Sequence, residues 1–204
     1  MIGLPRSTEV NRRVPKDKLY ANASLTPKSK EMIKEQIEAI VWRNKLADKT
    51  IAVAAGETVN EIHVFELQLR QRDLHKNILP AVAKAIPYKI LFILTFGDEA
   101  QAWMAAAGTF YNTNWQPLDG FTLKFEGLNL DAVYENLARQ IAGGRLDAAS
   151  DIADAVERDK QRQKLEREIA ALEKKILREK QFNRQVKLNA ELKAMQRQRE
   201  ELTQ

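Results

Sequence analysis

The stretch between residues 61 and 107 constrains the fold more than any other part of the chain, because it holds most of the strongly β-forming apolar residues. Its centre is the apolar run of residues 90–96. An uninterrupted run of this length is typical of a central strand that is covered on both faces. Gly97 and Asp98 supply turn chemistry, so we expect residues 100–106 to return antiparallel beside it.

Residues 62–70 alternate between apolar and polar side chains and predict a second strand. One face carries Phe65, Leu67 and Leu69, and the other carries Val64, Glu66, Gln68 and Arg70. We therefore expect a strand with one buried face and one polar face. Residues 50–53 are expected to pair with it as a hairpin, because Gly56 and Glu57 can form the turn between them.

A helix is predicted before these strands. Thr26 and Pro27 form a typical helix start, since the threonine hydroxyl can cap free N–H groups and proline fits the first helical position. The apolar stripe that follows at helical spacing consists of Ile33, Ile37, Ile40 and Val41. This spacing predicts a helix that continues to about Leu46, with Trp42 on its flank as a core or interface anchor.

The segment after residue 120 predicts one more strand and one more helix. Phe121, Leu123 and Phe125 alternate with polar residues, which is typical of a half-buried strand. Asn129 is expected to cap a helix that stops at Gly143.

The last 48 residues contain neither glycine nor proline and predict long helices. A first heptad seam consists of Leu165, Ile169, Leu172 and Ile176, and a second seam includes Leu188, Leu192 and Met195. The second seam lies roughly 120° around the helix from the first. Either one long helix presents two apolar faces, or the chain doubles back near residues 179–183 as a hairpin. In both cases these seven residues are the candidates for binding a partner, a second copy or each other.

The chain as a whole is therefore predicted to be of the α+β class. Residues 1–144 are expected to form a globular domain, with a mainly antiparallel sheet, packed helices and a basic N-terminal arm. Residues 145–204 are expected to form an all-α coiled-coil tail or a helical hairpin.

The formal net charge of +5 is concentrated at the two ends. Residues 1–31 carry seven Lys or Arg against three Asp or Glu, and residues 157–204 carry fourteen against nine. Basic ends are compatible with nucleic acid or an acidic protein, although the solvated faces of a coiled coil give the same count. The candidate nucleic-acid-binding residues are Arg6, Arg12, Arg13, Lys16 and Lys18.

The sequence carries few signs of catalysis. It has no glycine-rich phosphate loop and no cysteine, and its two histidines, His63 and His75, are expected to be structural. We therefore expect no cofactor and no metal site. The one arrangement that could hold Mg²⁺ for a nuclease consists of Glu57, Glu61, Glu66 and Gln68. Solvated charges at a sheet edge explain the same residues.

Neither a membrane span nor a secretory signal is expected. No apolar run approaches the roughly 20 residues that a spanning helix needs, and the N-terminal sequence lacks the apolar segment of a signal peptide. With no cysteine available for disulfides, the sequence indicates a cytoplasmic protein.

Several stretches resemble the bacterial domain of unknown function 4391 family in their order and spacing. They read LPRSTEVNRRVPK, IVWRNKL, VFELQLRQRDL, AIPYKILFIL, GLNLDAVYENLARQIAG and EKQFNRQVKLNAELK. The resemblance covers essentially the whole chain, including the C-terminal helices. It implies no catalytic residue. It does imply an association with helicases or DNA methyltransferases of restriction or anti-phage defence systems.

These observations favour a non-enzymatic accessory or adaptor protein of a bacterial DNA-processing or anti-phage defence system. Such a protein would bind a partner protein through its C-terminal helices, with nucleic acid as a second candidate ligand. Two alternatives stay open. One is a metal-dependent nuclease that uses residues 57–68, and the other is a purely structural oligomerisation module.

Overall fold

The computed structural model describes residues 3–22, 25–84 and 86–202. The chain divides into two compact units, Met1–Gly144 and Arg145–Gln204. We call them the globular unit and the helical unit. Within the described residues no helix is long and apolar enough to cross a membrane.

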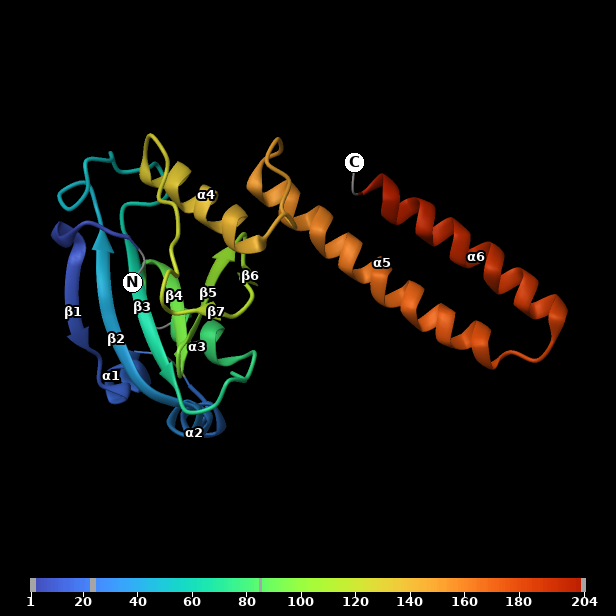
Figure 1. Ribbon diagram of the computed structural model, residues 1–204, viewed down its shortest axis with the longest axis horizontal. Helices are drawn as coiled ribbons and strands as arrows, with labels where there is room; N and C mark the ends of the chain where they lie inside the picture. Colours follow the sequence, from blue (N-terminus) through green and yellow to red (C-terminus); the bar gives the residue numbers. More distant parts are fainter. Residues whose placement is uncertain (1–2, 23–24, 85, 203–204) are drawn as a thin grey trace. The chain divides into compact units, whose positions relative to one another are not determined.

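The globular unit is of the α+β class and is built on one mostly antiparallel sheet (Figure 1). Its strands run in the spatial order β1 (Glu9–Arg13), β2 (Ile37–Leu46), β3 (Ile62–Leu69), β4 (Lys89–Phe96), β5 (Glu99–Ala106) and β6 (Thr109–Asn112), and the short β7 (Gln116–Pro117) also pairs with β5. Only the β3–β4 pair is parallel among these pairs, because α3 (Ile78–Lys84) connects the two strands as a crossover.

One face of the sheet packs against three short helices. They are α1 (Lys16–Asn22), α2 (Pro27–Gln36) and α3. Their apolar residues Leu19, Ile33, Ile78, Leu79 and Val82 join a core that includes Phe65, Leu67, Phe92 and Leu94 from β3 and β4. The opposite face packs against α4 (Leu130–Ala142) over β5 and β6. The sheet is thus covered on both sides where β4 runs, as its apolar sequence predicts.

Local signals correctly predict the starts of α2 and α4 and the end of α4. The Thr26 hydroxyl accepts a hydrogen bond from the Ser29 N–H at 3.2 Å, which caps α2. The Asn129 side chain accepts from the Ala132 N–H at 2.9 Å, which caps α4. Gly143 ends α4 in the left-handed conformation, with φ of 61°.

Three sequence predictions in the globular unit are wrong. The predicted helix that continues to Leu46 ends at Gln36, and residues 37–46 form β2 instead. Residues 50–53 form turns and bends and do not pair with β3, which lies between β2 and β4. Residues 121–125 form no ladder, although Phe121 and Leu123 are buried as the alternation predicts.

The basic N-terminal arm is part of the folded unit. Its residues form a single turn of 3₁₀ helix at Arg6–Thr8, then β1, which pairs with β2, and then α1. The arm is therefore folded, with Arg6 in the 3₁₀ turn, Arg12 and Arg13 on β1, and Lys16 and Lys18 on α1.

The loop between β2 and β3 is fastened to the start of α4. The Asp131 carboxylate accepts hydrogen bonds from the backbone N–H groups of Glu57, Thr58 and Val59 and from the Thr58 hydroxyl, the latter at 2.8 Å. These bonds, led by the Thr58 hydroxyl, lower the pKa of Asp131. Gly56 leaves room for the carboxylate, since a Cβ there would lie 2.3 Å from its carboxyl carbon.

The helical unit contains two helices that lie side by side, α5 (Ile152–Arg178) and α6 (Phe182–Glu201) (Figure 1). The chain doubles back between them, so the hairpin alternative describes this unit and the single long helix does not. Leu165, Ile169 and Leu172 of the first seam are buried. Ile176, Leu188, Leu192 and Met195 are half-buried.

Candidate nucleic-acid interface

A groove of about 300 Å³ opens on the globular unit next to the basic arm. Its lining residues come from β1, α1, β2, β3 and the segment before β4, and they are Arg12, Arg13, Val14, Pro15, Lys18, Leu19, Trp42, His63, Phe65, Ile86, Pro87 and Tyr88. We call it the basic–aromatic groove. Three strands and one helix that are far apart in sequence therefore contribute to one concave site.

A ladder of three aromatic rings crosses this groove. The ring centroids of Trp42 and His63 lie 4.9 Å apart, those of His63 and Tyr88 lie 4.4 Å apart, and the planes of each pair differ by 7°. The strand pairing explains the ladder, because Trp42 on β2 lies beside β3 and His63 on β3 lies beside the start of β4. His63 in the middle is 5% exposed, whereas Tyr88 at the end is 48% exposed.

His63 is held neutral within this ladder. Burial lowers its pKa, and the hydrogen bond to Glu61 opposes that change only in part. The Nε2 atom lies 2.9 Å from Glu61 Oε2. Because a carboxylate only accepts, Nε2 of the neutral ring carries the proton and donates it. Lys45 Nζ lies 2.7 Å from Glu61 Oε1, and this contact holds the pKa of Glu61 below its usual value.

The structure brings three of the five predicted nucleic-acid-binding residues together. Arg12, Arg13 and Lys18 line the groove, and all three are exposed. In the described part of the chain none of the three makes a side-chain ion pair or hydrogen bond. Lys16 instead donates to the Ile37 carbonyl. Arg6 lies in the 3₁₀ turn and does not line the groove.

The cations near the groove repel one another. Burial lowers the pKa of Lys16, and the positive charges of Arg70 and Arg13 lower it further. Glu38 is the one neighbouring group that raises this pKa. The charged groups that act on Lys16 are thus mostly positive, which favours an anionic ligand near it.

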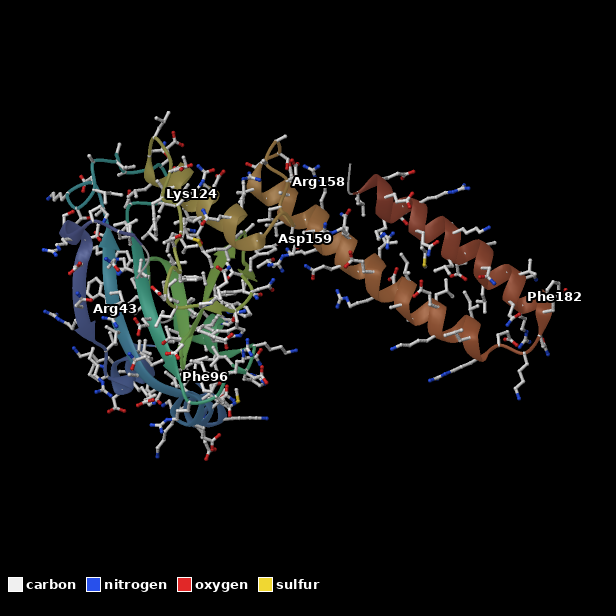
Figure 2. All side chains as sticks on the ribbon, viewed as in Figure 1. Arg43, Phe96, Lys124, Arg158, Asp159 and Phe182 are labelled. Atoms are coloured by element: carbon white, nitrogen blue, oxygen red, sulfur yellow. The ribbon has the colours of Figure 1, made fainter. Side chains whose placement is uncertain are left out.

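The strand face that the sequence indicated as polar is buried at Val64 and Glu66, half-buried at Gln68 and exposed at Arg70. Glu66 is 2% exposed and pairs with Arg43, whose Nε lies 2.6 Å from Glu66 Oε2 (Figure 2 labels Arg43). Gln68 donates to Glu66 Oε1 at 3.0 Å, and Arg43 also donates to the Asn11 side chain at 3.3 Å. Glu66, Arg43 and Asn11 border a second pocket of about 310 Å³. The charge of Glu66 is thus paired with that of Arg43 within the same unit.

The acidic residues considered for Mg²⁺ binding are not brought together. Glu61 pairs with Lys45 and His63, while Glu66 pairs with Arg43 on the opposite face of the sheet. Glu57 is exposed in the loop fastened by Asp131. No group of three or more His, Cys, Asp or Glu that could hold a metal ion occurs in residues 3–22, 25–84 and 86–202.

Sequence reasoning found the cations but missed the ladder. The helical spacing predicts Trp42 on the flank of a helix, and nothing in the sequence relates it to His63. The register of β2 and β3 sets Trp42 opposite Phe65, two residues from His63.

The sequence of this chain matches one family model over residues 2–198, nearly its whole length. The family is described as a domain of unknown function, DUF4391. The chain belongs to the DUF4391 family. No curated protein and no solved structure matches the chain. The groove of this DUF4391 protein therefore has to be interpreted from its own residues.

Proposed function

We propose that this protein is a non-enzymatic adaptor of a bacterial DNA-processing or anti-phage defence system and works in the cytoplasm. In this proposal the globular unit binds nucleic acid and the helical unit binds a partner protein. The observation that carries the proposal is the basic–aromatic groove, in which exposed Arg12, Arg13 and Lys18 surround stacked aromatic rings.

The three cations suit phosphate groups. A phosphate contact needs an exposed, unpaired Arg or Lys, and the absence of nearby ion pairs meets that need within the described residues. Such contacts release counterions from the nucleic acid, so the binding constant should fall steeply as salt rises. They also carry no sequence information, so the protein should bind different sequences with similar affinity.

The test is fluorescence anisotropy with labelled DNA of several sequences over a salt series. The Arg12→Ala/Arg13→Ala variant should weaken binding and reduce the slope of log K against log salt by about 0.7 to 0.9 for each lost phosphate contact. The matched control is Lys28→Ala/Lys49→Ala, which removes two exposed cations outside the groove. Equal affinities for the two variants, or no binding by the wild type at low salt, would refute nucleic-acid binding at this groove.

The helical unit supports the partner-binding half of the proposal. We infer that its two seams pair as a short antiparallel coiled coil, which leaves them largely occupied by one another. Unpaired apolar side chains instead gather at the turn, where Leu177 is 84% exposed, Phe182 75% and Val186 52% (Figure 2 labels Phe182). Residues 174–187 carry six basic residues and one acidic residue. An acidic protein surface with an apolar cleft would complement this turn.

A helicase or a DNA methyltransferase would be the expected partner. Tagged full-length protein should retain an acidic protein from its host, and the purified pair should bind again when mixed. The Leu177→Ser/Phe182→Ser variant should lose that protein. Leu188→Ser is a useful comparison, because it changes the half-buried second seam. Light scattering of both proteins tests the other outcome, in which the wild type is a dimer and Leu177→Ser/Phe182→Ser is a monomer. That result would instead favour a self-associating module.

A further inference from the structure

We propose that the basic–aromatic groove selects single-stranded nucleic acid and stacks one base on the exposed face of Tyr88. This inference rests on the proposed nucleic-acid binding. It adds that the ligand is single-stranded and that the stacking of a base on Tyr88 selects it over a duplex.

The first step of the argument is the exposure of Tyr88. One face of its ring stacks on His63, at 4.4 Å between centroids. Yet the residue is 48% exposed, which is unusual for an aromatic ring whose task is only to fill the core. A flat ring that stacks on one side and is half exposed to solvent offers a platform on which a further planar group can stack.

The second step is that the platform is rigid before any ligand arrives. His63 is buried between Trp42 and Tyr88, and its hydrogen bond to Glu61 fixes the ring. The Trp42 indole N–H donates to the Asn44 carbonyl at 3.0 Å, which fixes the other end of the ladder. A base that stacks on Tyr88 would therefore extend an existing stack and would not have to order it, which lowers the entropic cost of binding.

The third step is the chemistry around the platform. Val14, Ile86 and Pro87 give the groove apolar walls, and Arg12, Arg13 and Lys18 give it positive charge. A base needs the apolar walls and the ring, while its phosphates need the cations. The volume of about 300 Å³ lies at the lower limit of the range for small-ligand pockets. A duplex keeps its bases stacked inside and presents phosphates and base edges, so it could use the cations but not the ring.

The experiment compares three labelled nucleic acids of equal length by anisotropy at low salt: oligo-dT, oligo-rU and a mixed-sequence DNA duplex. We expect the wild type to bind at least one single strand more than tenfold tighter than the duplex. Tyr88→Ala should weaken single-strand binding by roughly 5- to 150-fold, the range that stacking of one base supplies. Tyr88→Phe should bind nearly as the wild type does, because it keeps the ring.

The outcomes separate this inference from the proposed function. Tyr88→Ala should leave the salt slope and duplex binding unchanged, whereas Arg12→Ala/Arg13→Ala should reduce both. If the arginine variant loses binding while Tyr88→Ala does not, the groove binds phosphates alone and the stacking inference fails. Equal affinity for duplex and single strand would also overturn it. If polyglutamate displaces oligo-dT as well as unlabelled oligo-dT does, the site is a general anion site and the inference again fails.

Discussion

The globular unit buries the charge of Glu66 within its sheet, whereas the helical unit exposes several apolar side chains close together at its turn. Glu66 is 2% exposed, it accepts hydrogen bonds from Arg43 and Gln68, and Arg43 also donates to Asn11. In the helical unit Leu177 and Phe182 lie mostly in water. The buried charge of the globular unit is therefore paired by residues of the same unit. The helical unit exposes neighbouring apolar side chains to solvent, which is typical of a segment that binds another molecule.

The two units can be followed separately in one experiment. All three tryptophans of the chain, Trp42, Trp103 and Trp115, lie in the globular unit, while the longest helices lie in the helical unit. Tryptophan fluorescence therefore reports the unfolding of the sheet, and circular dichroism at 222 nm reports mainly the helices.

The largest expected effect comes from charging the buried seam of the hairpin. Ile169→Asp/Leu172→Asp places two carboxylates where each wild-type side chain contributes about 1.5 to 3 kcal/mol by its burial. The helical unit should lose its order, since paired seams supply most of the stability of helices in proteins. Helical ellipticity should fall sharply while the tryptophan transition stays in place.

Leu177→Asp is the matched control for that experiment, because the same charge enters at a position that is 84% exposed. It should keep the wild-type ellipticity. Wild-type ellipticity in the double variant would show that the seam is solvated, and the contrast between the two units would then disappear.

The next effect should come from breaking the buried ion pair of the globular unit. Arg43→Ala leaves Glu66 charged and without its partner. We expect a loss of roughly 3 kcal/mol, at the lower end for a buried pair because the Arg43 side chain is 34% exposed. Urea unfolding followed by tryptophan fluorescence measures the change.

The half-buried pair of Lys45 and Glu61 provides the comparison for Arg43, because the Glu61 side chain is 23% exposed whereas that of Glu66 is 3% exposed. Lys45→Ala should cost less than Arg43→Ala, because water still reaches the Glu61 carboxylate. The double variant Arg43→Met/Glu66→Gln should recover part of the loss, because it removes the unpaired charge. If Arg43→Ala unfolds at the same urea concentration as Lys45→Ala, water reaches Glu66. The side chain of Glu66 would then be more accessible to solvent than the structure indicates.

A smaller effect is expected from pH. Burial lowers the pKa of His63 below its unfolded value of 6.5, so the unfolded chain binds the proton more readily than the folded chain. The stability that the neutral ring provides is complete above pH 6.5 and declines as the pH falls toward the folded pKa. His63→Phe keeps a stacking ring and removes the titration.

The comparison is therefore the fluorescence-detected stability of wild type and His63→Phe between pH 7 and pH 5. The wild type should lose more stability than the variant over this window. Parallel curves would show that His63 is not held neutral by burial. The pKa of Glu61 is lowered, so its contribution to the free energy of unfolding is lost only at more acidic pH than that of His63. The effects of Glu61 and His63 can therefore be distinguished.

The smallest expected effect is at the turn of the hairpin. Phe182→Ser should change the stability by no more than about 0.5 kcal/mol, because the side chain is 75% exposed. Leu172→Ser should cost several times more, because Leu172 is buried. The change in helical melting temperature should be measured for both variants. The ratio of the two changes tells how much more the buried Leu172 stabilises the helical unit than the exposed Phe182 does. A large loss for Phe182→Ser would mean that Phe182 stabilises the helical unit itself.

Sequence signals that depend on neighbouring residues predicted the structure well. The caps at Thr26 and Asn129 and the stop at Gly143 each rest on one short hydrogen bond or one backbone conformation. The apolar run of β4 and its turn at Gly97 are equally local, and the antiparallel return as β5 follows from them. The two long helices of the helical unit likewise follow from the helical spacing of their apolar residues.

Features that depend on strand register could not be predicted in this way. Ile33, Ile37 and Ile40 fit a helical stripe, yet the last two belong to β2, since its pairing with β1 and β3 outweighs local spacing. Glu66 looked solvated because its partner Arg43 lies on another strand. The cations of the groove can be recognised in the sequence. The stacking of the three aromatic rings cannot, because it depends on how β2, β3 and the segment before β4 pair in the sheet.

Asp131 also changes how the surface loop before β3 should behave over time. Backbone N–H groups in an exposed loop normally exchange their hydrogens with solvent quickly. Here the amides of Glu57, Thr58 and Val59 donate to one carboxylate from α4, so each must break that bond before it can exchange. These three amides should therefore exchange more slowly than the other amides of the loop, and they should lose that protection together when Asp131 is replaced by alanine.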